Sequence, residues 1–151
     1  MATTVTASTL KVTVKEEITL NGKKHEYKQE QSIASVNMIA QRIVRVPTSL
    51  KTILSFGAAI GAGTYANSDV KYIRVTNLDD TNYITLGLMD TSADTAYFKI
   101  DKGETMVFHN TNIEAKTDGA VFGTFSDIDT INAQANTAAV DIEIFVASSQ
   151  S

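Results

Sequence analysis

Apolar and polar residues alternate along residues 70–109, and three polar segments interrupt the alternation. Alternation with a period of two is typical of a β-strand with one buried face. The interruptions read LDDTN, DTSADT and DKGE, and they are rich in residues that form turns. This segment therefore predicts four strands of an antiparallel β-sheet. The residues expected to face its core are Ile73, Val75, Ile84, Leu86, Leu88, Phe98, Ile100, Met106 and Phe108.

Residues 10–20 show the same alternation over a longer stretch, which ends at Asn21 and Gly22. Asn-Gly is the dipeptide best suited to a two-residue type I′ turn, so this part of the chain predicts a long β-hairpin. One face of its first strand is apolar except for a single glutamate. The residues of that face are Leu10, Val12, Val14, Glu16, Ile18 and Leu20.

The return strand of this hairpin is more polar. On the parity that should be buried it carries His25, Tyr27, Gln29 and Gln31. A polar inner face predicts that the hairpin projects beyond the core. The two-residue turn places Lys15 opposite Lys28, and the same register places Glu17 opposite Glu26, so diagonal Lys–Glu pairs must offset the repulsion. A longer turn with a bulged register is the alternative.

Two extended segments are predicted between the hairpin and the central strands. Residues 35–47 favour a strand that ends at Pro47, because proline terminates the ladder of hydrogen bonds. A helix over residues 35–42 is the alternative. Residues 49–56 follow as an extended segment.

The chain beyond residue 109 predicts two short strands and then a long connection. The short strands lie near Ile113 and over residues 121–125, and a turn at 117–119 separates them. Residues 126–139 are interpreted as the connection, which can hold one helical turn. The region therefore contributes little regular structure until the last strand begins.

The last strand has the clearest alternation of the late part of the chain. Its inward residues are Val140, Ile142, Ile144 and Val146. We count eight to ten strands in all, so the sequence predicts an all-β fold, an antiparallel β-sandwich similar to a jelly roll, with a long N-terminal β-hairpin. The side chains expected to be most deeply buried are Ile84, Leu86, Phe98, Phe108, Ile142 and Ile144.

Length and composition narrow the class of protein. The 151 residues suffice for one domain, and we expect a β-sandwich at 10–147 that includes the hairpin at 10–33, with polar segments at 1–9 and 148–151. The absence of cysteine excludes disulfides and thiolate chemistry. The net charge of −4 and the scattered basic residues disfavour a nucleic-acid partner. No secretory signal or membrane-spanning run is expected.

Candidate catalytic residues are sparse. His109 in DKGETMVFHN loosely resembles the second metal-binding motif of the cupins, but the companion motif with its paired His and Glu ligands is absent. No G-x-S-x-G elbow marks a nucleophile, and the aspartates near the turns lack the spacing of a calcium loop. We therefore expect no enzyme, no catalytic or metal site and no cofactor.

The features that remain favour contacts with other proteins. The sequence GAAIGAG lacks the Lys and the following helix of a phosphate loop, so its glycines are expected to allow close approach of backbones. Three tyrosines share the outward parity of the central strands and could contact a protein or a sugar. The interface residues predicted on this basis are Asn21, Gly22, Tyr72, Tyr83, Tyr97, Gly57, Gly61 and Gly63.

The sequence YIRVTNLDDTNYITLGL, followed by AYFKIDKGETMVF, resembles a recurrent pattern in small β-sandwich structural proteins of tailed bacteriophages. In such proteins the matching residues are turn and strand-entry positions without a catalytic role. The residues of this chain that match them are Thr76, Asn77, Asn82, Tyr83, Lys102, Gly103 and Glu104. The resemblance covers only this central part of the chain.

The resemblance implies a virion structural protein, most simply an auxiliary capsid subunit of the decoration or cement type. Its partners would be further copies of itself, as a homo-oligomer, and the major capsid or tail subunits. It would be made in the host cytoplasm and reside in the virion. A tail-tube, collar or fibre component is the first alternative. A carbohydrate-binding module that uses the tyrosine face is the second, and a cupin-type enzyme comes last.

Overall fold

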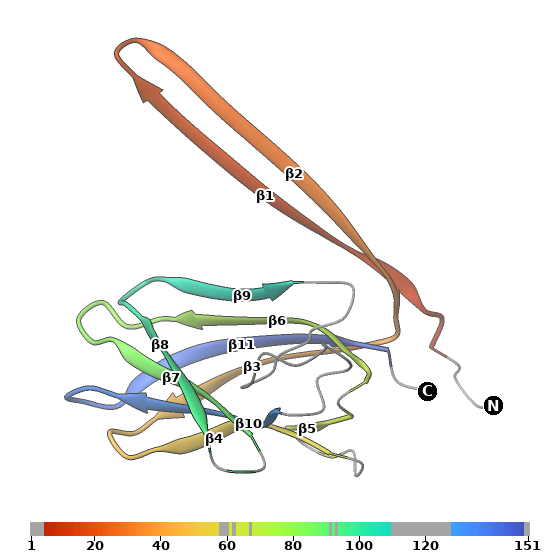
Figure 1. Ribbon diagram of the computed structural model, residues 1–151, viewed down its shortest axis with the longest axis vertical. Coiled ribbons are helices and arrows are strands. Elements are labelled where there is room, and N and C mark those ends of the chain that lie inside the picture. The colour runs from red at the N-terminus through yellow and green to blue at the C-terminus, as the bar shows by residue number, and fades with distance from the viewer. Residues whose placement is uncertain are drawn as a thin grey trace.

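The computed structural model of the chain describes residues 5–57, 61, 63–66, 68–90, 92, 94–109 and 128–149. These residues form eleven strands and no helix (Figure 1). In chain order the strands are β1 (Ser8–Leu20), β2 (Lys23–Val36), β3 (Met38–Val46), β4 (Lys51–Phe56), β5 (Thr64–Tyr65), β6 (Val70–Asn77), β7 (Ile84–Asp90), β8 (Thr95–Ile100), β9 (Thr105–His109), β10 (Ile128–Ala135) and β11 (Val140–Ser148). The alternative of a helix over residues 35–42 is wrong, because β2 and β3 occupy that segment.

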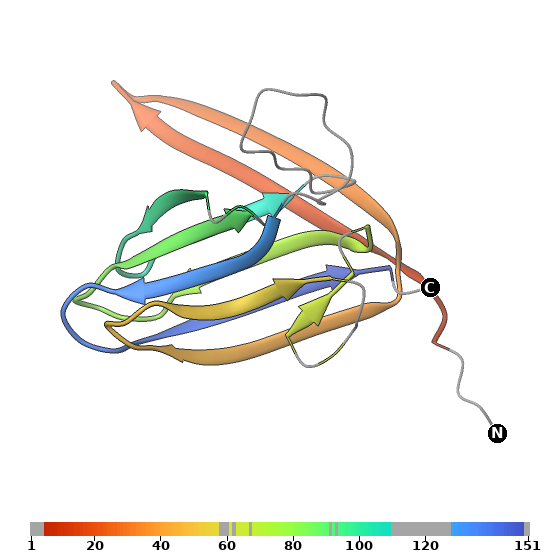
Figure 2. The same ribbon diagram turned by 60° about the horizontal axis from the view of Figure 1, so that its bottom comes forward.

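Two sheets form the body of the protein, and the β1–β2 hairpin stands apart from both (Figures 1 and 2). One sheet has the strand order β3-β11-β6-β9, and the other has the order β5-β4-β10-β7-β8. When the two-residue β5 is left out, the remaining eight strands of the body, from β3 to β11, can be numbered 1 to 8 in chain order. The two sheets then have the strand orders 1-8-3-6 and 2-7-4-5. This is the order of a jelly roll. The described pairs of strands are antiparallel except β4–β5, so the prediction of an antiparallel, jelly-roll-like sandwich is confirmed.

The core lies between the two sheets and follows the predicted alternation closely. Of the side chains expected to be most buried, Ile84, Leu86, Ile142 and Ile144 have almost no exposed surface. Phe108 is partly buried against the same cluster. The prediction for Phe98 is wrong: it remains 38% exposed, because β8 is an edge strand in which only the last residue is buried.

The four strands predicted at 70–109 exist, but they do not form one sheet. The chain runs from β6 in one sheet to β7 and β8 in the other, and then returns with β9 to pair with β6. Asn77 holds the first crossover, because its Nδ2 donates to the carbonyls of Asn82 (2.9 Å) and Ile100 (3.3 Å). Gly103, with φ of 70°, turns the chain back before β9. The polar turns therefore connect layers of the sandwich.

The prediction of a long connection at 126–139 is wrong, since β10 occupies residues 128–135 and pairs with both β4 and β7. A bulge between Ile128 and Thr130 changes the parity of the strand, so Ile128 and Ile131 both point into the core although they are three residues apart. The strands predicted near Ile113 and at 121–125 lie outside the described residues, as does the turn at 117–119.

Candidate interaction surface

The β1–β2 hairpin is the feature that distinguishes this chain from a plain sandwich. Its register places Lys15 opposite Lys28 and Glu17 opposite Glu26, as predicted. Asn21 and Gly22 both have positive φ, 50° and 76°, which is the conformation of a type I′ turn. The hairpin projects away from the body and leaves it at the end where β3 begins and β11 ends (Figure 1).

One face of the hairpin carries a row of ion pairs. The ammonium group of Lys15 lies 2.8 Å from the Glu17 carboxylate and 3.8 Å from that of Glu26. Lys24 lies 3.3 Å from Glu17 and 2.8 Å from Glu26. The diagonal pairs thus compensate the like charges that face each other directly. All four side chains are exposed, so this row contributes little stability and makes the face soluble.

The other face of the hairpin carries the apolar residues of β1 beside the more polar residues of β2, and it is buried only at its base. We call it the apolar face. At the base, Leu10 and Val12 of β1 pack against a small cluster of buried residues from β2 and from the outer face of the β3-β11-β6-β9 sheet. The members of that cluster are Ile33, Val36, Tyr72 and Ala147, with Phe145 beside them. This cluster is separate from the main core and ties the hairpin to the body.

Two aromatic side chains on the outer face of the sheet receive the hairpin. The rings of Tyr72 and Phe145 meet edge to face, with 5.8 Å between their centroids and 76° between their planes. Arg74 donates a hydrogen bond to the Glu143 carboxylate, and its guanidinium lies 5.8 Å from the centre of the Phe145 ring. Burial raises the pKa of Tyr72, and the nearby Arg74 charge opposes this.

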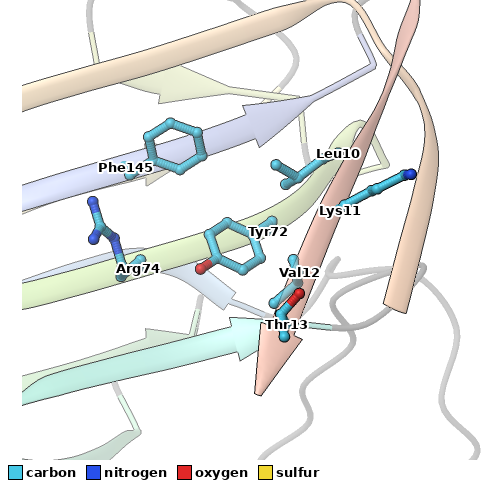
Figure 3. A pocket seen from close by; sticks show the side chains of 7 residues that line it. All are labelled: Leu10, Lys11, Val12, Thr13, Tyr72, Arg74 and Phe145. Carbon is cyan, nitrogen blue, oxygen red and sulfur yellow. The ribbon is translucent and has the colours of Figure 1, made fainter. Parts of the chain in front are cut away.

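A cleft of about 290 Å³ opens where the hairpin leaves the sheet. Its walls are the inner side of β1 and the outer face of β6 and β11 (Figure 3). The side chains that line it are Leu10, Lys11, Val12, Thr13, Tyr72, Arg74 and Phe145. The cleft was not expected from the pattern of the strands. Its signal was two aromatic residues, Tyr72 and Phe145, on strand parities expected to face water.

A bulge at the base of the hairpin accompanies its departure from the sheet. The register shifts between Ser8 and Leu10, so that three steps along β2 match two along β1. Ser35 lies inside the bulge and has φ of 62°, a left-handed conformation that is uncommon for a serine. Such bulges bend a strand, so this one sets the direction in which the hairpin meets β3.

Beyond its base the apolar face of the hairpin has no cover. Ile18 and Leu20 near the tip are 58% and 59% exposed, and Val14 and Tyr27 are exposed as well. A second uncovered apolar stripe lies on β3, the edge strand of the sheet that receives the hairpin. On its outer side Ile39 is 64% exposed and Ile43 is 66% exposed.

The three tyrosines predicted to share a face are dispersed. Tyr72 is buried beneath the hairpin, whereas Tyr97 belongs to β8 of the other sheet and is 63% exposed. The Tyr97 ring lies over Gly87, where a Cβ would come within 3.2 Å of it. Tyr83 precedes β7 and has the Lys99 ammonium group 4.6 Å from its ring centre. The idea of one exposed tyrosine face was wrong, because the crossover after β6 separates these residues into different layers.

The predicted glycines have two different environments. At Gly63, with φ of 83°, a Cβ would lie 3.0 Å from the Arg42 guanidinium, which donates a hydrogen bond to the carbonyl of Ile53. This glycine therefore allows a close contact within the chain. Gly57 and Gly61 have open space around them. An interface role for these glycines, and for Asn21 and Gly22, remains a prediction.

Within the described residues, no three His, Asp or Glu side chains come together as metal ligands would. The backbone of His109 pairs with Tyr72 at the end of β9. The residues that the structure describes also contain no helix that could cross a membrane. The exposed apolar face of the hairpin is the candidate interaction surface that the geometry supports.

No protein-family model matches the chain, and a comparison with curated proteins gives no match. Among solved structures, the chain is similar to a protein of Bacillus endospore appendages, described as a novel family of disulfide-linked pili. The two chains are 14% identical, the TM-score is 0.42, and the alignment covers 75% of this chain and 89% of that chain. A likeness of this size carries no argument about function.

Proposed function

We propose that this chain is a structural subunit that acts by assembly, and that its hairpin joins it to neighbouring subunits. The observation that supports this most directly is the uncovered apolar face of the hairpin, where Ile18 and Leu20 keep more than half of their surface exposed. A two-stranded hairpin without further cover is marginally stable in water. A partner that covers this face would order the hairpin and remove apolar surface from water.

We further propose that the assembly is a phage virion, with the chain as an auxiliary capsid subunit of the decoration or cement type. The support is the sequence resemblance at 72–88 and 96–108 together with a jelly-roll body, an architecture used in viral capsid domains. Asn77 and Asn82, two residues of that resemblance, hold the crossover between the sheets. A tail-tube, collar or fibre subunit would use the hairpin in the same way and is the alternative.

In this proposal the partners are further copies of the chain and the major capsid or tail subunits. The protein would be located in the virion. Residues 10–147 would act as one unit, with 1–9 and 148–151 as polar segments available for contacts. The role requires no catalysis and no cofactor. A platform of three tyrosines for sugar binding is not available, because Tyr72 lies under the hairpin.

Binding to particles tests the proposal. Purified protein is mixed with shells or tails that lack it, sedimented, and quantified in the pellet, while light scattering follows the protein alone. We expect saturable binding to one particle component and growth of scattering with concentration. If the protein stays monomeric at high concentration and binds neither shells nor tails, the proposal is wrong.

A further inference from the structure

We propose that, in the assembly, the outer half of the hairpin's apolar face lies on the β3 side of the receiving sheet of a second copy. This inference rests on the proposed assembly function and specifies its contact. The outer half is defined here as Val14, Ile18, Leu20 and Tyr27. The acceptor stripe is defined as Ile39, Gln41, Ile43 and Arg45 on the outer side of β3.

The proposed contact continues one that already exists within the chain. At the base of the hairpin, Leu10 and Val12 pack on the outer face of the β3-β11-β6-β9 sheet at Tyr72 and Phe145. That contact buries the hairpin face only at its base, where Ile39 at the start of β3 lines a cleft with Leu10 and Val36. Each chain is therefore left with an exposed part of each surface, and aliphatic side chains project from both of these parts.

The exposed residues of the hairpin and of β3 have matching patterns. On the hairpin, Val14 and Ile18 are four residues apart with Glu16 between them on the same face. On β3, Ile39 and Ile43 are four residues apart, again with one polar residue between them. Four residues of strand span ~13 Å in both cases. Stacked strands can therefore place both apolar pairs in contact at once.

The two surfaces carry side chains of opposite charge. Glu16 is the carboxylate of the hairpin's apolar face, and it is outside the row of ion pairs that the described residues form on the opposite face. Arg45 ends the acceptor stripe, with its side chain 70% exposed and 3.6 Å from Asp141. Stacking that matches the two apolar pairs places Glu16 opposite Gln41, with one same-face position between Gln41 and Arg45. A carboxylate and a guanidinium then lie within the same contact, whereas a hairpin stacked on a hairpin offers Glu16 no guanidinium.

The size of the contact indicates what it can build. Two strands ~25 Å long and ~10 Å wide cover ~250 Å², well below the ~800 Å² per partner of a standard interface. One such contact is too weak for a stable pair in solution. Because donor and acceptor are different surfaces, each copy can make both contacts, which leads to rings or extended arrays in which weak contacts add up.

Disulfide trapping tests this contact cleanly, because the chain has no cysteine of its own. Two single variants, Ile18→Cys and Ile43→Cys, are purified, mixed and mildly oxidised at high concentration. Thr19→Cys, on the charged face of the same strand, replaces Ile18→Cys as the donor control. Gln134→Cys, exposed on β10 of the other sheet, replaces Ile43→Cys as the acceptor control.

We expect the Ile18→Cys and Ile43→Cys mixture to give several times more cross-linked dimer than either control mixture. An equal yield in all mixtures, or a higher yield from Ile18→Cys alone, would overturn the proposed contact. Light scattering of the same proteins under reducing conditions separates the two proposals. If the proteins assemble but this pair is not trapped, the docking surface is wrong and the assembly function stands; if they neither assemble nor bind particles, both are wrong.

Discussion

Strands β1 and β11 have the same alternating pattern but differ in how deeply their apolar side chains are buried. In β11 the residues Ile142 and Ile144 are fully buried between the two sheets. In β1 the residues Ile18 and Leu20 are more than half exposed, although they alternate just as regularly with polar neighbours. Alternation therefore predicts a strand with two unlike faces, whereas burial depends on whether another layer covers the apolar face. On the hairpin that layer ends near Val12.

The largest difference in stability should come from a matched pair of alanine substitutions, one in the core of the sandwich and one on the hairpin. Leu86→Ala removes a side chain with no exposed surface, and we expect a loss of about 2–5 kcal/mol in the free energy of unfolding. Ile18→Ala should cost less than about 0.5 kcal/mol in the isolated protein, because its side chain stays in water. Chemical denaturation of both variants measures the difference. Similar losses would show that the hairpin is covered in the free protein.

Truncation at the junction should give an intermediate effect. Tyr72→Ala removes a ring that packs against the hairpin base and Phe145, and we expect a loss of about 1–3 kcal/mol, below that of a central core residue. Hydrogen exchange should accelerate in β1 and β2 and stay unchanged in β7. Equal acceleration in β7 would mean that Tyr72 supports the whole sandwich rather than the hairpin alone.

A smaller and local effect is expected at the hairpin turn. Gly22→Ala places a Cβ on a residue with φ of 76°, and a left-handed residue costs about 1–2 kcal/mol. Gly57→Ala is the matched control, since that glycine has open space and no positive φ. Exchange of the β1 and β2 amides should rise only in the Gly22 variant. A neutral outcome at Gly22 would contradict the type I′ turn.

The smallest effect is a dependence on pH in the crossover after β6. The backbone N–H groups of Asn82 and Thr81 donate to the Asp79 carboxylate and hold its pKa below the ordinary 3.8. A lowered pKa in the folded state adds stability above pH 3.8, which is lost as the pH falls through the lower value. Asp79→Ala should therefore be less stable than the natural protein at pH 7, and the gap should close in acid. A gap that stays constant with pH would refute this role.

The sequence predicted the hairpin in detail because its determinants are local. The Asn21-Gly22 turn and the parity of β1 were enough to obtain the register of Lys15 with Lys28. The arrangement of the body was harder to predict. Nothing local shows that Asn77 sends the chain to a second layer, since its partners Asn82 and Ile100 are found only in the folded chain.

The missed strand and the missed site have related causes. Residues 126–139 were predicted to be a connection, yet Asn132 within them is buried, and its side chain accepts a hydrogen bond from Thr52 (2.8 Å). The bulge at Ile128 also hid the alternation. The cleft at Tyr72 and Phe145 depends on where the hairpin crosses the sheet. The bulge at Ser35 lies at this crossing, and the alternation of apolar residues does not reveal its position.

The role of the hairpin is tested most directly by changing its uncovered face alone. A triple variant with Val14→Thr, Ile18→Thr and Leu20→Thr places a polar, β-branched residue at all three positions. Thr13→Ser with Thr19→Ser on the charged face serves as the control. We expect the triple variant to keep the unfolding midpoint of the natural protein and to lose self-association and binding to particles, as measured by light scattering and co-sedimentation. Assembly at the level of the natural protein and the control would contradict the proposal that the hairpin joins the subunits.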